Sequence, residues 1–444
     1  MKFNFLNNIV GWLVCIFACA VYLLTMEPTV SLWDCGEFIS CVKELQVPHP
    51  PGAPMFVMIG RFFTLFAADD ASVALMVNAM SAIASGFGVL FLFWTITRLA
   101  KKAIGKAKDE RLEMSDTVAV LAAGVVGALA CCFADSYWFS AVEGEVYALS
   151  SFFTALVFWG IMKWEAVSED EDADKWIVFI AYMMGISIGV HLLNLLTIPA
   201  MVFVYFFKRR EEFDALHEKV GMFSRDLFGF GFAAIVGVFA LLFLQYGVIP
   251  GIPVLMSKFE LLFVNSLGLG FNSGIWALIV ILVGGVVAAI YYSHKKGMRF
   301  WNTISTALAM ILIGYSSYFM VVIRSSANPG IDMNNPEEPF NLVSYLLREQ
   351  YGETPLFSGQ YYMAPIKYNS DGTPVKSKVK KKYYPAEDGT YKVKATKWSP
   401  EYMDNYVGIF PRMWSGQGRH VKEYRKRVNR YLDGKSEFEI VDII

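Results

Sequence analysis

Charged residues are scarce in this sequence. Asp, Glu, Lys and Arg make up 18% of the 444 residues, whereas 55% are hydrophobic and 16% are aromatic. Soluble domains of this total length need a more polar surface, so the composition favours a lipid-embedded chain. The net charge of −1 points to no nucleic-acid partner.

Common sequence motifs of nucleotide and metal chemistry are also missing. The chain has no P-loop, no Gly-rich dinucleotide fingerprint and no His/Cys spacing typical of zinc sites. No internal repeat is visible. Four of the six cysteines lie in apolar runs, while Cys35 and Cys41 fall in a loop, where a disulfide between them is an open alternative. Nucleotide-driven chemistry therefore has no visible site.

Long apolar runs dominate what is present. A transmembrane helix needs about 20 apolar residues. Nine segments qualify: Ile9–Thr25, Ala71–Leu99, Thr117–Phe133, Val146–Met162, Trp176–His191, Leu192–Phe207, Gly229–Val248, Ser273–Tyr292 and Asn302–Ile323. The first is either a cleaved signal or an anchor, and its apolar character past the Ala18-Cys19-Ala20 site favours the anchor. Residues 176–207 are long for one span and short for two, so we predict two short helices turning near His191 and Asn194.

Basic residues occur in alternate loops. They follow the second, sixth and eighth spans, starting at Arg98, Lys208 and Lys295, whereas the intervening loops hold few. The positive-inside rule then places the N-terminus in the cytoplasm and residues after Arg324 outside. We predict an all-α polytopic membrane domain over residues 1–324, with a large first outer loop at 26–70. A small α+β extracytoplasmic region follows at 325–444.

Local patterns predict further elements in the two outer regions. Met55–Ala67 is typical of an amphipathic or partly embedded helix. Lys376–Tyr384 and Thr390–Lys397 flank a turn and predict a β-hairpin, while His420–Leu432 predicts a basic helix.

Two outer loops concentrate ionisable residues. In the first, Asp34 and Glu37 share one face if Trp33–Leu45 is helical. In the second, Glu143 and Glu145 have no Lys or Arg nearby in sequence. Acids at a membrane edge must be solvated, protonated, paired across the fold, or engaged with a substrate or metal ion. Paired carboxylates suit proton abstraction.

Several other residues have two interpretations. His49 either binds a phosphate or simply opens a Pro-rich turn. His191 either hydrogen-bonds within the helix bundle or binds a ligand. Arg324 either snorkels to the headgroups or clamps a phosphate. Trp33 and Trp138 accompany the acids of the two loops.

Five motifs resemble a known family. Trp33-Asp-Cys-Gly-Glu-Phe38, His49-Pro-Pro-Gly-Ala-Pro54, Trp138-Phe-Ser-Ala-Val-Glu143, Ala327-Asn-Pro-Gly-Ile-Asp332 and Arg348-Glu-Gln-Tyr-Gly352 are similar to a bacterial family of protein O-mannosyltransferase-like proteins. The resemblance implies the GT-C bundle architecture and a site at the outer face of the bacterial cytoplasmic membrane. Members usually continue into further helices, so truncation of this chain is an open alternative.

The resemblance also implies roles. A sugar, expected to be mannose, is taken from a polyprenyl-phosphate carrier and given to a protein Ser or Thr hydroxyl. Asp34 would activate the acceptor, sharing that role with Glu37, and Glu143 would orient the acceptor or hold a divalent metal ion. The remaining substrate-binding candidates, some of which could neutralise the lipid phosphate, are Trp33, His49, Arg61, Trp138, Glu145, His191 and Arg324.

Two other functions remain open. A lipid-linked sugar transporter or flippase predicts broken helices with polar residues at the bilayer midplane and inverted repeats. A non-catalytic membrane scaffold predicts that Asp34→Asn and Glu143→Gln are tolerated. The acids of this sequence instead gather at one predicted membrane edge.

Overall fold

The computed structural model describes residues 2–107, 111–209, 222–352, 357–362, 364–411, 415 and 417–431. The chain forms two compact units. Unit 1 comprises Met1–Phe263 and Asn272–Leu347, and unit 2 comprises Val264–Phe271 and Arg348–Ile444. The predicted domain boundary at residue 324 stays a prediction.

Apolar helices make up most of unit 1. Seven segments of the described chain are long and apolar enough to cross a membrane, which indicates a multi-pass membrane protein. They are Phe3–Thr25, Asp70–Ala103, Met114–Cys132, Val146–Val167, Leu227–Ser266, Ser273–Lys295 and Arg299–Ser325. Each overlaps a predicted span, but the predicted count of nine is not confirmed. The other two predicted spans are short helices, because α8 (Asp174–Ile188) has 15 residues and Leu192–Lys208 begins as a 3-10 turn.

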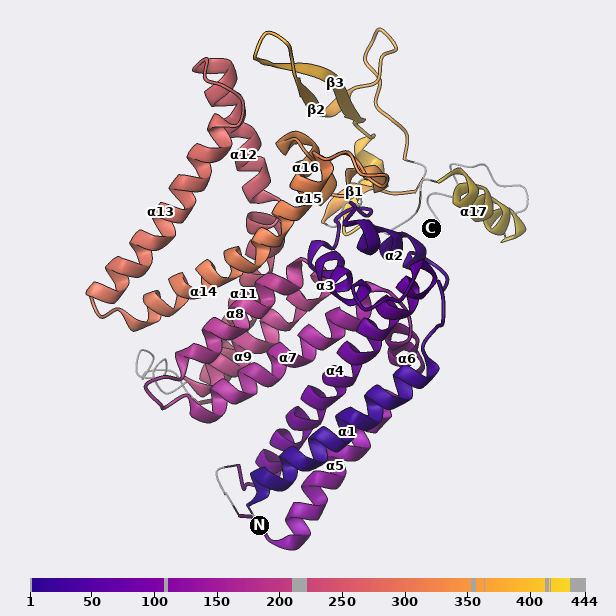
Figure 1. Ribbon diagram of the computed structural model, residues 1–444. Coiled ribbons are helices and arrows are strands. Elements are labelled where there is room, and N and C mark those ends of the chain that lie inside the picture. The colour runs from indigo at the N-terminus through magenta and orange to yellow at the C-terminus, as the bar shows by residue number, and fades with distance from the viewer. Residues whose placement is uncertain are drawn as a thin grey trace. The chain divides into compact units, whose positions relative to one another are not determined.

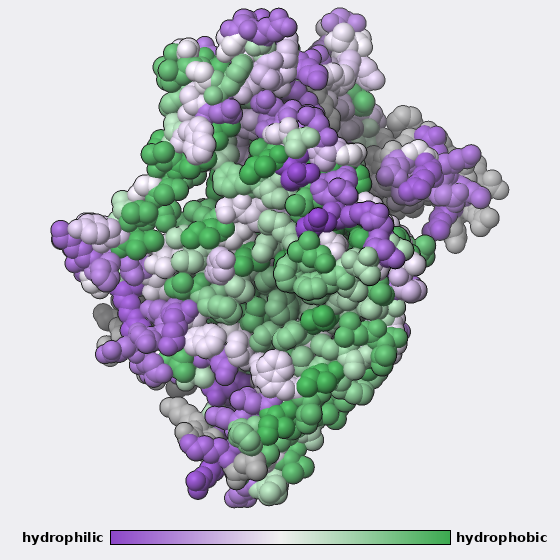
Figure 2. All heavy atoms as spheres, in the orientation of Figure 1, coloured by the Kyte–Doolittle hydropathy of each residue, from purple (hydrophilic) through white to green (hydrophobic). Residues whose placement is uncertain are grey.

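Helix α4 (Val73–Ala103) is the centre of the N-terminal half of unit 1. It packs against α1 (Phe3–Thr25), α5 (Met114–Cys132) and α7 (Val146–Val167) (Figure 1). The outer face of α1 exposes Leu13 and Ile16 by 60% and 63%, and apolar side chains cover this part of the surface in Figure 2. Such a continuous apolar surface suits contact with lipid.

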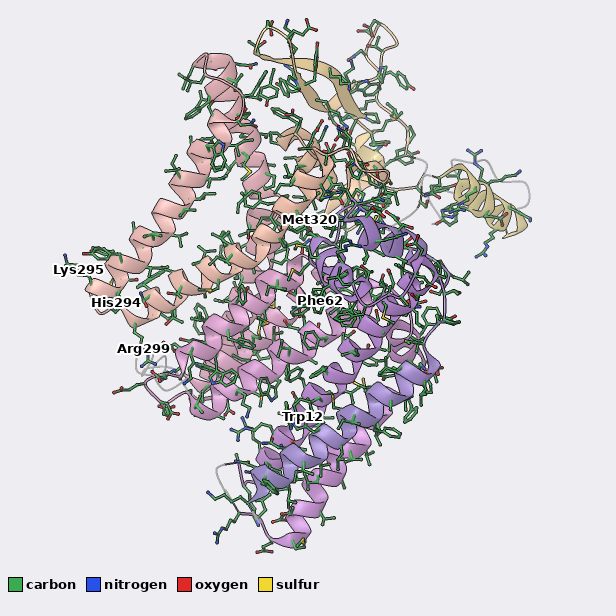
Figure 3. The ribbon with its side chains drawn as sticks, viewed as in Figure 1. Trp12, Phe62, His294, Lys295, Arg299 and Met320 are labelled. Atoms are coloured by element: carbon green, nitrogen blue, oxygen red, sulfur yellow. The ribbon has the colours of Figure 1, made fainter. Side chains whose placement is uncertain are left out.

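The second half of unit 1 contains α8, α9 (Ile198–Lys208), α11 (Met222–Leu242), α12 (Gly251–Leu261), α13 (Ser273–Lys295) and α14 (Arg299–Tyr315). Helices α8 and α14 approach closely at two glycines. A Cβ on Gly314 would lie 2.4 Å from the carbonyl carbon of Gly185, so only glycine fits there. Figure 3 shows His294, Lys295 and Arg299 together at the α13–α14 connection, one of the predicted basic loops.

Short helices gather beyond one end of α4. They are α2 (Cys35–Glu44), α3 (Pro54–Thr64) and α6 (Asp135–Ala141), and all three contact α4 or one another (Figure 1). Helix α3 confirms the amphipathic helix expected in the first loop, and α6 lies in the second acidic loop. Cys35 and Cys41 are separate buried thiols on α2, so the disulfide considered between them is not formed. Helices α15 (Phe319–Ser325) and α16 (Pro339–Leu346) complete unit 1.

Unit 2 contains the predicted strands. Strands β2 (Lys376–Pro385) and β3 (Tyr391–Pro400) form an antiparallel hairpin, which confirms the predicted one. Strands β1 (Ser358–Gln360) and β4 (Val407–Ile409) form a second antiparallel pair. The predicted basic helix is α17 (Gly418–Tyr431), and its expected last residue, Leu432, lies outside the described residues.

Candidate functional site

Helix α2 places two carboxylates of the first loop on one face. Asp34 occupies its N-cap position and Glu37 lies in its first turn, as predicted. The opposite face is buried through Cys35, Phe38 and residues one turn further along, because these apolar side chains recur every three to four residues. The Asp34 and Glu37 side chains remain 58% and 26% exposed, so a substrate can reach both.

His49 pairs with both carboxylates. Its backbone N–H donates to Oε1 of Glu37 at 2.6 Å, and its Nδ1 lies 3.0 Å from Oε2 of the same residue. Its Nε2 lies 3.9 Å from Oδ2 of Asp34. Hydrogen bonding to Glu37 raises the pKa of His49, although burial opposes the shift. Burial alone would raise the pKa of Glu37, but its hydrogen bonds with His49 lower it overall.

The segment that carries His49 is held by residues beyond the last candidate span. The N–H of Val47 donates to the Ile331 carbonyl at 3.0 Å, and the Met333 N–H donates back to the Val47 carbonyl at 3.2 Å. The hydroxyl of Tyr345, a fully buried residue of α16, donates to the Pro48 carbonyl at 2.5 Å. These bonds fix the two residues that precede His49 and so help to position its imidazole.

Arg61 and Arg324 bind the C-terminal end of α2. Arg61 Nη1 donates to the Lys43 carbonyl at 2.6 Å. Arg324 Nε and Nη2 donate to the carbonyls of Leu45 and Glu44 at 2.7 and 3.1 Å. The last carbonyls of a helix lack intrahelical partners and carry partial negative charge, so two guanidinium groups satisfy them well. Both arginines therefore anchor α2, and their expected role at a phosphate stays a prediction.

Arg324→Ala is expected to destabilise the protein by about 1–3 kcal/mol, because the variant leaves two helix-end carbonyls without their charged donors. Thermal unfolding in detergent measures this change. Lys43→Ala is the matched control, since the Lys43 side chain only reaches the exposed Asp70. Equal melting temperatures for Arg324→Ala and wild type would rule out the anchoring role.

The second loop brings two buried glutamates to the same end of unit 1. Glu143 and Glu145 are 4% and 7% exposed. The Ser31 hydroxyl donates to Oε2 of Glu143 at 2.7 Å, and this bond joins the two acidic loops. Gly144 packs tightly against α4 and α2, because an added Cβ would lie 3.1 Å from Cγ1 of Val77 on α4 and 3.2 Å from Cγ1 of Ile39 on α2.

Glu145 is the electrostatically unusual residue of this site. Burial, reinforced by the negative charge of Asp34, raises its pKa to about 7. Among the described residues, its Oε2 atom has no hydrogen-bond partner. A buried carboxyl oxygen without a partner is costly, so Glu145 exchanges its proton near neutral pH or meets a group that arrives with the substrate.

Three sequence candidates lie outside this cluster of contacts. Trp33 precedes Asp34 with its side chain 84% exposed. Trp138 is on α6, where its Nε1 donates to the Thr25 hydroxyl at 3.1 Å, at the end of α1. His191 starts the 3-10 turn after α8, and its Nδ1 accepts from the Leu193 N–H at 3.2 Å. Trp138 and His191 thus have local structural partners, and Trp33 is exposed to solvent. A contact of these residues with substrate stays a prediction.

The arrangement supports proton transfer from an acceptor. Asp34 is the accessible carboxylate, and His49 links it to the better-buried Glu37. Ligand atoms of the three side chains lie within 4.8 Å of one another, so the same group could hold a divalent cation. The Glu37–His49 hydrogen bond already gives these residues a role without an ion, namely keeping the imidazole oriented beside Asp34.

Sequence reasoning missed the residues that assemble the cluster. Ser31, Gly144 and Tyr345 connect segments that lie far apart along the chain. Ser31 lies two residues before the Trp33 motif, and Gly144 directly follows the motif that ends at Glu143. Nothing local marks Tyr345, whose partner is 297 residues away.

Comparisons with known proteins point to one family for this region. Residues 34–214 match a family described as "Protein O-mannosyl-transferase TMEM260 N-terminal domain". Protein O-mannosyl-transferase TMEM260 of Mus musculus is 29% identical over 178 residues, 39% of this chain and 22% of that protein. The Dictyostelium discoideum protein of the same name is 25% identical over 203 residues, 43% of this chain and 23% of its own length. The matched region thus spans less than a quarter of each relative.

The C-terminal region has a separate match. Residues 352–438 match a family of unknown function, DUF8416. No solved structure matches the chain.

Proposed function

Because the chain is O-mannosyltransferase-like over residues 34–214, as its motifs predict, we propose that it is a membrane glycosyltransferase acting on protein hydroxyl groups. The observation that carries the proposal is the Asp34, Glu37 and His49 cluster at the start of α2, within the matched region. The names of the relatives support mannose as the sugar. The matched region covers less than a quarter of each relative, so the sugar and the acceptor are part of the proposal.

Asp34 is the proposed general base. Its carboxylate takes the proton of a Ser or Thr hydroxyl, the hydroxyl oxygen bonds to the anomeric carbon, and the bond from that carbon to the carrier phosphate breaks. The phosphate leaves with the bonding electron pair. His49, held by Glu37, keeps its Nε2 3.9 Å from Oδ2 of Asp34 and so helps to position that carboxylate. Glu143, held by Ser31, orients the acceptor.

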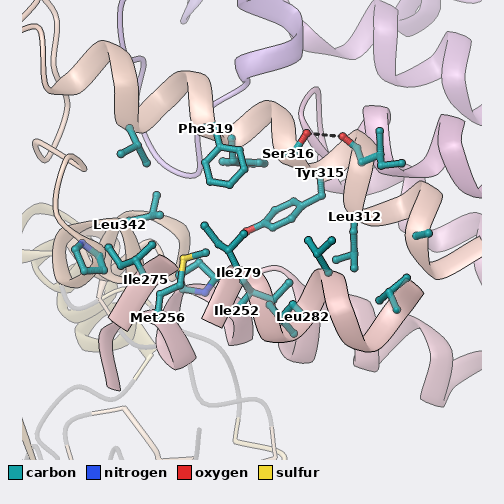
Figure 4. Close-up of a pocket in the computed structure, with 18 of the residues that line it drawn as sticks. Ile252, Met256, Ile275, Ile279, Leu282, Leu312, Tyr315, Ser316, Phe319 and Leu342 are labelled. Atoms are coloured by element: carbon teal, nitrogen blue, oxygen red, sulfur yellow. Dashed lines mark hydrogen bonds between the residues drawn. The ribbon is translucent and has the colours of Figure 1, made fainter. Parts of the chain in front are cut away.

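The proposed donor carries its sugar on a polyprenyl phosphate. An apolar cavity of about 430 Å³ between α12, α13, α14 and α16 suits a hydrocarbon chain (Figure 4). Helix α16 links the cavity to the site, since Leu342 lines the cavity and Tyr345, one turn later, bonds beside His49. The cavity therefore supports a lipid-borne donor whose head reaches the α2 cluster.

Filling this cavity is expected to weaken donor binding. Ile279→Trp on α13 adds a large ring to the cavity and should raise the KM for a lipid-linked sugar about tenfold or more, with kcat within about twofold. Ile281→Trp is the matched control, because Ile281 on the same helix is 57% exposed and does not line the cavity. Steady-state rates at several donor concentrations provide the measurement. If the KM of Ile279→Trp equalled that of Ile281→Trp, the donor would not bind in this cavity.

The proposed location is the outer face of a bacterial cytoplasmic membrane, with the N-terminus in the cytoplasm. The charge pattern of α4 supports this orientation. Val73 and Val77 in its first turns belong to the same apolar cluster as Phe38 of α2 and Phe56 of α3. Lys101 and Lys102 lie in the last turn of α4. Basic residues favour the cytoplasmic end of a span, so the acidic cluster falls on the opposite side.

Reconstitution tests the proposed function. Full-length protein in lipid vesicles is given a polyprenyl-phosphate-linked sugar and a secreted-protein acceptor, and intact mass spectrometry follows the acceptor. We expect a mass increase of one hexose per modified hydroxyl. Movement of the lipid-linked sugar across the bilayer without any acceptor modification would instead establish the transporter alternative. The sequence shows no internal repeat, which argues against that alternative.

A further inference from the structure

The connection between α12 and α13 belongs to unit 2. Residues 264–271 group with residues 348–444, yet in sequence they join two candidate spans, Leu227–Ser266 and Ser273–Lys295. A short connection between two membrane helices must lie where they leave the bilayer. Part of unit 2 is therefore fixed at a membrane–water boundary by the chain itself.

This connection is fastened to the β2–β3 hairpin. Asn265 Nδ2 donates to the Tyr391 carbonyl at 2.8 Å, and the Tyr391 N–H donates to Asn265 Oδ1 at 2.8 Å. The Phe271 and Tyr391 rings meet edge to face at 4.9 Å. Tyr391 pairs with Pro385 as the last pair before the hairpin turn. The turn end of the hairpin thus lies at the connection between the two spans.

The surface formed there combines apolar and basic side chains. In the connection, Leu267 and Leu269 are 58% and 45% exposed. Tyr384, in the second-last pair before the hairpin turn, is 40% exposed and belongs to a residue type enriched at membrane interfaces. The exposed lysines of the hairpin include Lys381, Lys382, Lys392 and Lys394. Of these, Lys392 is paired with Asp388 at 2.6 Å.

Residues 348–444 as a whole are basic, like the surface of the hairpin. Residues 348–444 contain 18 Lys and Arg against 12 Asp and Glu. Basic residues at a boundary with exposed leucines match the headgroup layer of an anionic membrane, where the leucines meet acyl chains and the lysines meet phosphates. An acidic protein would satisfy the lysines but would leave the leucines in water.

We propose that residues 264–271 and the β2–β3 hairpin form a membrane-surface-binding element specific for anionic headgroups. Leu267 and Leu269 insert into the headgroup layer, while Lys381, Lys382 and Lys394 contact the lipid phosphates. The element lies within unit 2, whose C-terminal segment matches a family of unknown function, and it operates independently of the proposed sugar transfer.

Hydrogen exchange of the full chain in nanodiscs tests this element. The discs contain phosphatidylcholine alone or a mixture with phosphatidylglycerol, and mass spectrometry follows peptides covering 264–271 and 381–394. We expect hairpin peptides to exchange at least about tenfold more slowly in the anionic discs, and high salt should remove the difference. Equal exchange in the two kinds of disc would overturn the proposal. It would also be overturned if an acidic protein added to the discs slowed exchange while the anionic lipid did not.

Variants separate the contact of the lysines with lipid phosphates from the insertion of the leucines. The triple variant Lys381→Gln, Lys382→Gln, Lys394→Gln should abolish the lipid dependence, whereas Lys367→Gln, a lysine of unit 2 bound to Asp404, should keep it. Leu267→Ser with Leu269→Ser should speed exchange of residues 264–271 in both discs. Unchanged exchange of α4 peptides verifies folding. A lipid dependence that survives in the triple variant would also overturn the proposal. No sugar donor or acceptor is used, so an inactive transferase does not affect the outcome.

Discussion

Asp34→Asn is expected to lower the rate of sugar transfer by about 100-fold to 10,000-fold, because an amide cannot take the acceptor proton. The fall should appear in kcat, with the donor KM within about twofold, since the substitution preserves shape and removes a group needed only in the transition state. The Asp34 side chain is 58% exposed, so the fold should tolerate the change. Rates with reconstituted protein and lipid-linked sugar measure it.

Asp135→Asn provides the matched control. Asp135 is an exposed acid in the first turn of α6, in the second acidic loop, and it has no part in the α2 cluster. Its variant should retain wild-type kcat. A kcat for Asp34→Asn equal to that of the control would assign the base to another residue, and a large rise in donor KM instead would make Asp34 a binding residue.

Glu145 is expected to make the protein less stable as pH rises. Its pKa is raised from the ordinary 4.5 to about 7, first by burial and then by the charge of Asp34. The folded chain therefore keeps a proton that the unfolded chain releases between these values. The contribution of Glu145 to the free energy of unfolding is fully present below pH 4.5. About 3 kcal/mol of it is lost as the pH rises from 4.5 through 7.

Glu145→Gln should remove this dependence, because a neutral amide replaces the protonated carboxyl at every pH. We expect melting temperatures of the variant and wild type to agree below pH 4.5, to diverge between pH 4.5 and 7, and to keep a constant difference above pH 7, where the variant is more stable. Glu27→Gln, an exposed acid of the first loop, should follow the wild-type profile. Parallel profiles for Glu145→Gln and wild type would show that Glu145 ionises normally. His49 also makes the protein less stable as the pH rises, because its pKa is raised in the folded state. This contribution is common to Glu145→Gln and wild type.

The elements that could be predicted are those with a strong local signal. The spans are apolar over lengths that few soluble segments reach, and α3 and the β2–β3 hairpin follow their periodicity and turn residues. Asp34 and Glu37 are neighbours on α2 because their spacing of three residues fixes this on any helix. The predicted count of nine spans is not confirmed at α8, because this helix has only 15 residues and is shorter than a full span.

The contacts that define the site depend on distant parts of the chain. Arg324 looks like a membrane-edge arginine in sequence, yet its partners are carbonyls 279 and 280 residues away. The raised pKa of Glu145 reflects burial between two loops, which no local pattern encodes. His49 was recognised as a candidate, but its bond to Glu37 requires the turn that Tyr345 holds in place.

Glycoprotein profiles of cells test whether the α2 cluster is the site of sugar transfer. Cells producing the wild-type chain, Asp34→Asn or Asp135→Asn at matched levels are compared by glycoprotein staining and by mass spectrometry of secreted proteins. We expect hexose-modified proteins that are present with wild type and Asp135→Asn to disappear with Asp34→Asn. Unchanged glycosylation in the Asp34→Asn cells would contradict the assignment of the α2 cluster as the site of sugar transfer.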